Sequence, residues 1–138
     1  MVTPAQEMFV AVEAGDAPKV AALLDKHPQL CNLAEKTGNR SSLLHMAARG
    51  GNLDIVELLV VADATLDKQD AAGFAPLHYA AVEGHLAVAQ VLVEAGARLR
   101  IWANGGRMPL DHAVGSKQHA VADYLRSEMI TRGLDLHS

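Results

Sequence analysis

Short blocks of apolar residues recur along this chain at a fixed interval. Residues 55–59, 88–92 and 121–125 form one set, in which each block lies 33 residues after the last and spaces its apolar side chains as one helix face does. A second set of apolar blocks, represented by residues 76–81, also recurs every 33 residues. Each of its blocks lies shortly before a block of the first set. A helix, a turn and a second helix repeated at this period predict stacked units that share one hydrophobic core.

The part of the chain that the rest repeats is residues 75–85, which read Ala-Pro-Leu-His-Tyr-Ala-Ala-Val-Glu-Gly-His. The residue 33 positions before His78 is His45, and the residue 33 positions after it is Asp111. These residues resemble the ankyrin repeat, whose motif is roughly Asp-x-x-Gly-x-Thr-Pro-Leu-His-x-Ala-Ala-x-x-Gly-His followed by an apolar helix. The best match runs over residues 70–97.

The resemblance implies an all-α ankyrin-repeat solenoid of four stacked helix–turn–helix units, joined by short hairpin-like turns in a single domain. The first and last units are expected to act as polar caps, because each has one neighbour instead of two. The first unit lacks the motif's signature, and Phe9 stands where the motif has His. The predicted segments are the repeats 4–36, 37–69, 70–102 and 103–133 and a frayed tail at 134–138.

Departures from the motif predict local differences between the units. Arg40 stands at the glycine position before the second unit's first helix, so the turn there is expected to differ from the usual hairpin. Ala75 replaces the Thr that would cap the third unit's first helix, a contribution of about 1 kcal/mol. The apolar helix positions should form the spine of the core: Leu44, Leu58, Leu59, Leu77, Val91, Leu92, Leu110, Tyr124 and Leu125.

Composition narrows the functional classes. A chain of 138 residues, half of them hydrophobic, fits one domain. Its net charge of −4 argues against nucleic acid, which selects clustered Lys and Arg. No apolar run is long enough to span a membrane, and residues 1–7 lack the pattern of a secretion signal. Cys31 is the only cysteine, so no internal disulfide is possible. We expect a cytoplasmic monomer without a cofactor.

Seven histidines raise the question of a metal or catalytic site. The resemblance gives His45 and His78 a structural role, hydrogen-bonded to backbone and capping groups near a helix start, and gives His85 a structural role between helices. No nucleophile elbow, glycine-rich phosphate loop or His-Glu-x-x-His motif occurs, so a non-catalytic protein is predicted. The alternative is an enzyme or metal-binding protein that uses His112 and His119 of the histidine-rich fourth repeat.

The prediction that remains is a surface for a protein partner. The resemblance implies that the partner binds the concave side, formed by the turn tips and the first helices. Phe74 and Trp102 fall on adjacent tips at positions where the fold needs no aromatic residue, and Trp often dominates binding energy. The alternative for Trp102 is packing against Ile101 or the last hairpin, whereas Tyr79 is expected to pack in the core. The predicted partner-binding residues are Ser41, Arg49, Gln69, Phe74, Val82, Glu83, Trp102, Asn104, Arg107 and Ser116.

Overall fold

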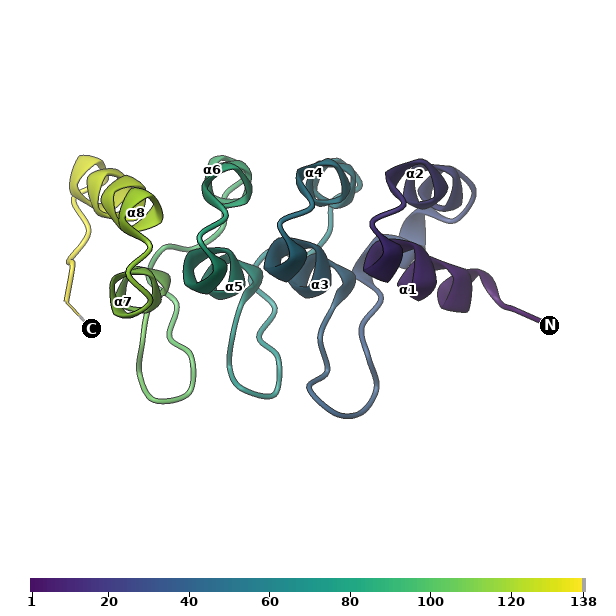
Figure 1. The fold of residues 1–138 in the computed structure, drawn as a ribbon, viewed down its shortest axis with the longest axis horizontal. Helices are drawn as coiled ribbons and strands as arrows, with labels where there is room; N and C mark the ends of the chain where they lie inside the picture. The colour runs from purple at the N-terminus through teal and green to yellow at the C-terminus, as the bar shows by residue number, and fades with distance from the viewer. Residues whose placement is uncertain (138) are drawn as a thin grey trace.

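The computed structural model describes residues 1–137, and this part of the chain is helical, without a β-strand. Figure 1 shows the helices in consecutive pairs that stand side by side, with the two termini at opposite ends of the row. This is the all-α solenoid of four stacked helix–turn–helix units that the sequence predicts. The helices are α1 (Pro4–Ala14), α2 (Ala17–Lys26), the 3-10 helix η1 (Pro28–Asn32), α3 (Leu43–Gly50), α4 (Leu53–Val61), α5 (Pro76–Glu83), α6 (Leu86–Glu94), α7 (Pro109–Gly115) and α8 (His119–Thr131).

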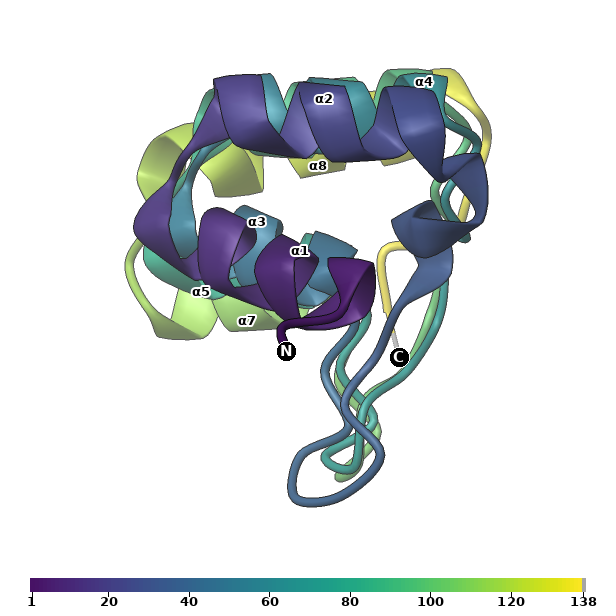
Figure 2. The same cartoon turned by 90° about the vertical axis from the view of Figure 1, so that its right-hand side faces the viewer.

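The helices lie in two layers. The first helices of the pairs, α1, α3, α5 and α7, form an inner layer, and α2, α4, α6 and α8 form an outer layer (Figures 1 and 2). Between pairs, the chain passes below the inner layer and turns back, as the three loops in the lower part of both figures show. We call these loops fingers 1, 2 and 3 and define them as residues 34–42, 67–75 and 100–108.

Local sequence explains where the inner helices begin. The Ser42 hydroxyl accepts the backbone N–H of His45 at 3.2 Å and so caps α3. Ala75 and Met108 occupy the same position before α5 and α7, and neither provides a side-chain cap. Pro at the first position of α5 and α7 compensates in part, because its fixed φ suits a helix start and it has no N–H to satisfy. The prediction that Ala75 leaves its helix without a side-chain cap is confirmed.

A close approach between units fixes glycine at the turn between paired helices. Gly51 has a φ of +71°, and a Cβ atom added there would lie 2.6 Å from the ring of His85 in the next unit. That ring reaches over the turn, and its Nε2 lies 3.1 Å from the carbonyl oxygen of Arg49. The structural role predicted for His85 is confirmed, and the bond ties one unit to the next.

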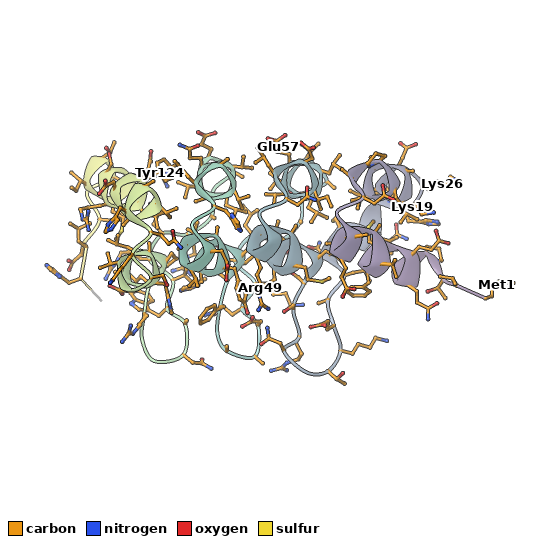
Figure 3. All side chains as sticks on the ribbon, in the orientation of Figure 1. Met1, Lys19, Lys26, Arg49, Glu57 and Tyr124 are labelled. Carbon is orange, nitrogen blue, oxygen red and sulfur yellow. The ribbon has the colours of Figure 1, made fainter. Side chains whose placement is uncertain are left out.

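The core runs without a break through all four units. Of the predicted spine, Leu58, Val91 and Tyr124 are half-buried and pack against the core at its edge. They lie on outer helices at equivalent positions, and Figure 3 shows Tyr124 in the outer layer, which no further layer covers. The other spine residues are buried: Leu44, Leu59, Leu77, Leu92, Leu110 and Leu125.

Finger 1 differs from the other two fingers, as its sequence predicts. Its hairpin closes with a bond from the Glu35 N–H to the Ser41 carbonyl at 2.9 Å, across six residues. Finger 2 closes across four residues, from the Asp70 N–H to the Phe74 carbonyl at 2.9 Å. Arg40, with a φ of +53°, takes the left-handed conformation that favours glycine.

The prediction of a frayed tail is wrong for residues 134–137, and Ser138 lies outside the described residues. The Leu134 N–H donates to the carbonyl of Met129 at 2.8 Å, and Leu134 and Leu136 pack half-buried against the core. Both leucines remove apolar surface from water at the end of the stack, which is reason enough for the segment to dock. None of the helices in residues 1–137 has the length and apolar character to cross a membrane.

Candidate partner-binding surface

Backbone hydrogen bonds hold the three fingers side by side. The N–H of Ala71 in finger 2 donates to the carbonyl of Asn39 in finger 1 at 2.8 Å. The N–H of Asn104 in finger 3 donates to the carbonyl of Ala72 at 3.1 Å, and its side-chain amide donates to the Ala71 carbonyl at 3.2 Å. A Cβ atom at Gly73 would lie 2.6 Å from the Asn104 nitrogen, so glycine is required for this contact. The tips therefore form one continuous edge, which we call the finger edge. Within it, Asn104 links finger 3 to finger 2.

A buried carboxylate joins fingers 1 and 2 to α5. Asp70 is 7% exposed, and its Oδ2 accepts hydrogen bonds from the Asn39 amide at 2.8 Å and from the Tyr79 hydroxyl. Its Oδ1 accepts the backbone N–H groups of Ala72 and Phe74, both at 3.0 Å. Burial raises the pKa of Asp70, but the hydrogen bonds from Tyr79, Phe74 and Asn39 outweigh burial and lower it below its usual value. Sequence reasoning missed this network, although Asp at the first motif position was a signal for it.

Phe74 packs in a cluster of rings. Its ring centroid lies 5.1 Å from that of Tyr79, 5.4 Å from that of His78 and 4.8 Å from that of His112. The residue is half-buried between α5 and α7. The expectation that the fold needs no aromatic residue there is wrong, because the ring fills the space where two units meet. Tyr79, expected to pack instead of bind, takes part in the same cluster.

Two neutral histidines link consecutive units, as the resemblance implies. The Nδ1 atoms of His45 and His78 accept the backbone N–H three residues earlier, at 3.1 and 3.0 Å. Each ring is then left with Nε2–H as the donor, which lies 2.7 Å from the Phe74 carbonyl and 3.0 Å from the Arg107 carbonyl respectively. Burial lowers the pKa of His78 to about 4 and lowers that of His45 as well. Their structural role is confirmed.

Trp102 is the most exposed aromatic side chain of the fingers, at 39%. The guanidinium of Arg100 lies 5.1 Å from its ring centroid, a cation–π distance. The Trp102 carbonyl accepts the side-chain amide of Gln69 at 2.8 Å, and that amide also donates to the Gly73 carbonyl at 2.9 Å. Gln69, predicted as a contact residue, therefore fastens finger 2 to finger 3.

Two of the predicted residues of the inner helices line a hollow. Arg49 and Glu83 contribute to a hollow of about 610 Å³, whose other lining residues belong to α1, α3 and the turns after them. The Arg49 guanidinium lies 5.7 Å from the ring centroid of Tyr79, and Figure 3 places Arg49 at the inner layer, on the side toward the fingers. Both charged residues are exposed.

The remaining predicted residues differ in how far the fold already uses them. Ser41 is half-buried, and its hydroxyl accepts the Asn39 amide at 2.9 Å. Val82 is half-buried on α5, and Ser116 is exposed at the end of α7. Arg107 is exposed on finger 3 and contributes its carbonyl, not its guanidinium, to the bond with the preceding unit.

The histidines of the fourth unit do not assemble a metal site. His112 packs against Phe74 and His78, whereas His119 is exposed at the start of α8. Across residues 1–137, no three His, Cys, Asp or Glu side chains come close enough together to hold a metal ion. The buried Nε2 of His112 has no hydrogen-bond partner within the same residues. In the third unit, the equivalent Tyr79 reaches Asp70, but finger 3 has Ala103 in place of that carboxylate.

Comparison with known protein families agrees with the architecture. The family described as "Ankyrin repeats (3 copies)" matches residues 8–103, which is more than half of the chain. The match runs from the first inner helix to Ala103 in finger 3. The tip of finger 3, α7 and α8 lie beyond it, and their place in the stack comes from the structure.

Proposed function

Because the chain belongs to the ankyrin-repeat family, we propose that it is a protein-binding module whose partner lies across the finger edge and the inner-helix face. Ankyrin repeats generally mediate protein–protein interaction and are typically non-catalytic. Their stacked units create extended surfaces on which partners bind. The proposal therefore concerns which part of this surface the partner contacts.

The observation that carries the proposal is the pair Trp102 and Arg107 on finger 3. Both side chains are exposed, and the bonds that tie fingers and units together use their carbonyl oxygens instead of their side chains. Trp and Arg are the residues most often found to dominate interface energies. By contrast, Gln69, Asn104 and Ser41 are already hydrogen-bonded within the fold, so we assign them a supporting part at the edge of the contact.

The proposal includes a cytoplasmic monomer that binds protein and not nucleic acid. The net charge of −4 supports the preference for protein. Light scattering during gel filtration tests the oligomeric state, and a mass close to 14.6 kDa is the expected result.

The test of the proposal is capture of partners from native cell extract with three forms of the full chain. The forms are wild type, Trp102→Ala with Arg107→Ala, and a control with Lys26→Ala and Glu57→Ala. Figure 3 shows both control residues in the outer layer, away from the fingers. A protein held by wild type and the control but lost from the finger variant is expected. Equal capture by all three forms, or loss from the control alone, would place the site elsewhere.

A further inference from the structure

The charges of this chain are segregated between the fingers and the rest of the molecule. The three fingers together hold five basic and three acidic residues, whereas the rest of the chain holds seven basic and thirteen acidic residues. An acidic protein thus carries a positive edge. The basic residues of the fingers are Lys36, Arg40, Lys68, Arg100 and Arg107.

The carboxylates of the fingers accept hydrogen bonds from backbone N–H groups. The Glu35 carboxylate accepts the N–H of Ser41 at 3.1 Å, and the Asp67 carboxylate accepts the N–H of Arg98 at 3.0 Å. The third, Asp70, is buried in the network described above. These groups therefore meet hydrogen-bonding needs of the loops and do not pair with the basic side chains of the edge.

The basic side chains of the fingers have no ionic partner in the part of the chain that the structure describes. The ion pairs found there join Lys19 to Glu7 at 3.1 Å, and Arg126 and Arg132 to carboxylates within or next to α8. All of the basic groups in these pairs belong to α2, α8 or the residue after α8. Lys36, Arg40, Lys68 and Arg107 are exposed, whereas Arg100 is half-buried beside the Trp102 ring. Exposed, unpaired side chains of one sign attract an anionic partner to the edge.

The spacing of the fingers selects the form of that partner. The fingers lie side by side, as the bond from Ala71 to Asn39 and the parallel loops of Figure 1 show. Helices of neighbouring units pack about 8–10 Å apart, so the fingers that they carry repeat at a similar distance. A peptide in the polyproline II conformation advances about 3.1 Å per residue with three residues per turn, so every third side chain would face the fingers at a spacing of about 9 Å.

Trp102 adds an apolar contact at one end of the positive edge. Its ring is exposed beside Arg100, and Arg107 follows on the same finger. We infer that the finger edge binds an extended acidic segment of a partner protein, with carboxylates on Lys36, Lys68 and Arg107 and an apolar side chain on Trp102. This inference rests on the proposed function and names the chemistry of the partner.

The test measures binding of a defined peptide to the full chain. The probe is a fluorescein-labelled peptide of about twelve residues with Glu at every third position, Ser between them and one central Leu. Its control has Gln in place of each Glu. Fluorescence anisotropy is measured at about 50 and 200 mM salt, because ionic contacts at an exposed edge weaken as salt rises. Trp102 is the only tryptophan, so an unlabelled copy of the peptide should also shift its emission.

Two variants with the same change in net charge locate the site. Lys36→Glu, Lys68→Glu and Arg107→Glu together reverse the finger edge, while Lys19→Glu, Lys26→Glu and Arg126→Glu together reverse charges on outer helices. All six side chains are at the surface, and circular dichroism with thermal melting checks that both variants fold. The finger variant is expected to bind the acidic peptide roughly tenfold more weakly or worse, and the outer variant to stay within about threefold of wild type.

Several outcomes would overturn the inference. They are no binding of the acidic peptide by wild type, equal binding of its Gln control, equal weakening by both variants, or tighter binding of a dT oligonucleotide of the same length. If the capture experiment yields a partner that the finger charge reversal leaves bound, the acidic segment is wrong and the protein-binding function stands. If wild type captures no protein, the proposed function itself fails.

Discussion

Phe74 and Trp102 both looked like contact residues in the sequence, and the structure predicts that their removal has different consequences. Phe74→Ala deletes a half-buried ring that meets three other rings at centroid distances of 4.8–5.4 Å. Truncation of a fully buried Phe costs about 3–5 kcal/mol, and ring pairs contribute about 0.5–1.5 kcal/mol each beyond area. A half-buried ring with overlapping contacts should therefore cost about 2–3 kcal/mol.

Trp102→Ala is the matched substitution. Its ring is 39% exposed, and its one ring contact is the cation–π pair with Arg100, which is worth about 0.5–1 kcal/mol at an exposed site. The hydrogen bond from Gln69 ends on the Trp102 carbonyl, so it survives the substitution. Because more than half of the Trp102 surface is out of water, lost burial adds to this term, and the expected loss of stability is about 1–2 kcal/mol, smaller than for Phe74→Ala.

Thermal melting followed by circular dichroism separates the two effects. In a chain of this size, 1 kcal/mol shifts Tm by about 3–4 °C, so Phe74→Ala should lower Tm by about 8 °C and Trp102→Ala by about 3–6 °C. Partner capture, measured below the Tm of both variants, should be weakened more by Trp102→Ala than by Phe74→Ala. A Phe74→Ala protein that melts with wild type would refute the packing role, and a Trp102→Ala protein that melts as low as Phe74→Ala would place the indole in the core.

Two further predictions concern buried polar groups. The pKa of His78 is about 4 in the folded chain and near 6.5 in the unfolded chain, so between these pH values the unfolded state binds more protons. The free energy of unfolding should therefore fall by about 3 kcal/mol as pH drops from 6.5 to 4. Urea unfolding at several pH values measures this loss, and a flat profile contradicts it. Ala103→Asp would place in finger 3 the carboxylate that Asp70 provides in finger 2, next to the Nε2 of His112, which has no hydrogen-bond partner within residues 1–137. It should stabilise by about 1–2 kcal/mol in urea unfolding at neutral pH, and a destabilised variant would show that the two fingers are not equivalent.

Periodicity predicted the stack because every unit meets the same neighbours. His45 and His78 could be assigned from the motif alone, since each donates to a carbonyl exactly one finger further on. The tail could not be assigned in this way. Its backbone repeats the exit of the earlier units, since the Leu134 N–H bonds to the Met129 carbonyl as the Ala97 N–H bonds to that of Leu92. However, α8 is longer than α6, so Leu134 and Leu136 fall outside the 33-residue register.

The candidate site was less predictable, because exposure depends on what a side chain touches across units. Phe74 reads as a tip residue in sequence, yet the rings it meets come from α5 and from α7, which begins 35 residues after it. The network of Asn39, Asp70 and Tyr79 likewise spans two units, so no local pattern shows that the Asn39 amide is already used.

These cross-unit contacts also show where along the finger edge a partner gains most. Fingers 1 and 2 use Asn39, Gln69 and Asp70 to bond with one another, with finger 3 and with α5, so a partner that engaged those groups would have to replace bonds that already exist. On finger 3, Trp102 and Arg107 give only their carbonyl oxygens to the stack. Their side chains can be desolvated by a partner without loss of an internal hydrogen bond, and this is why binding energy should concentrate at the finger 3 end of the edge while fingers 1 and 2 contribute charge.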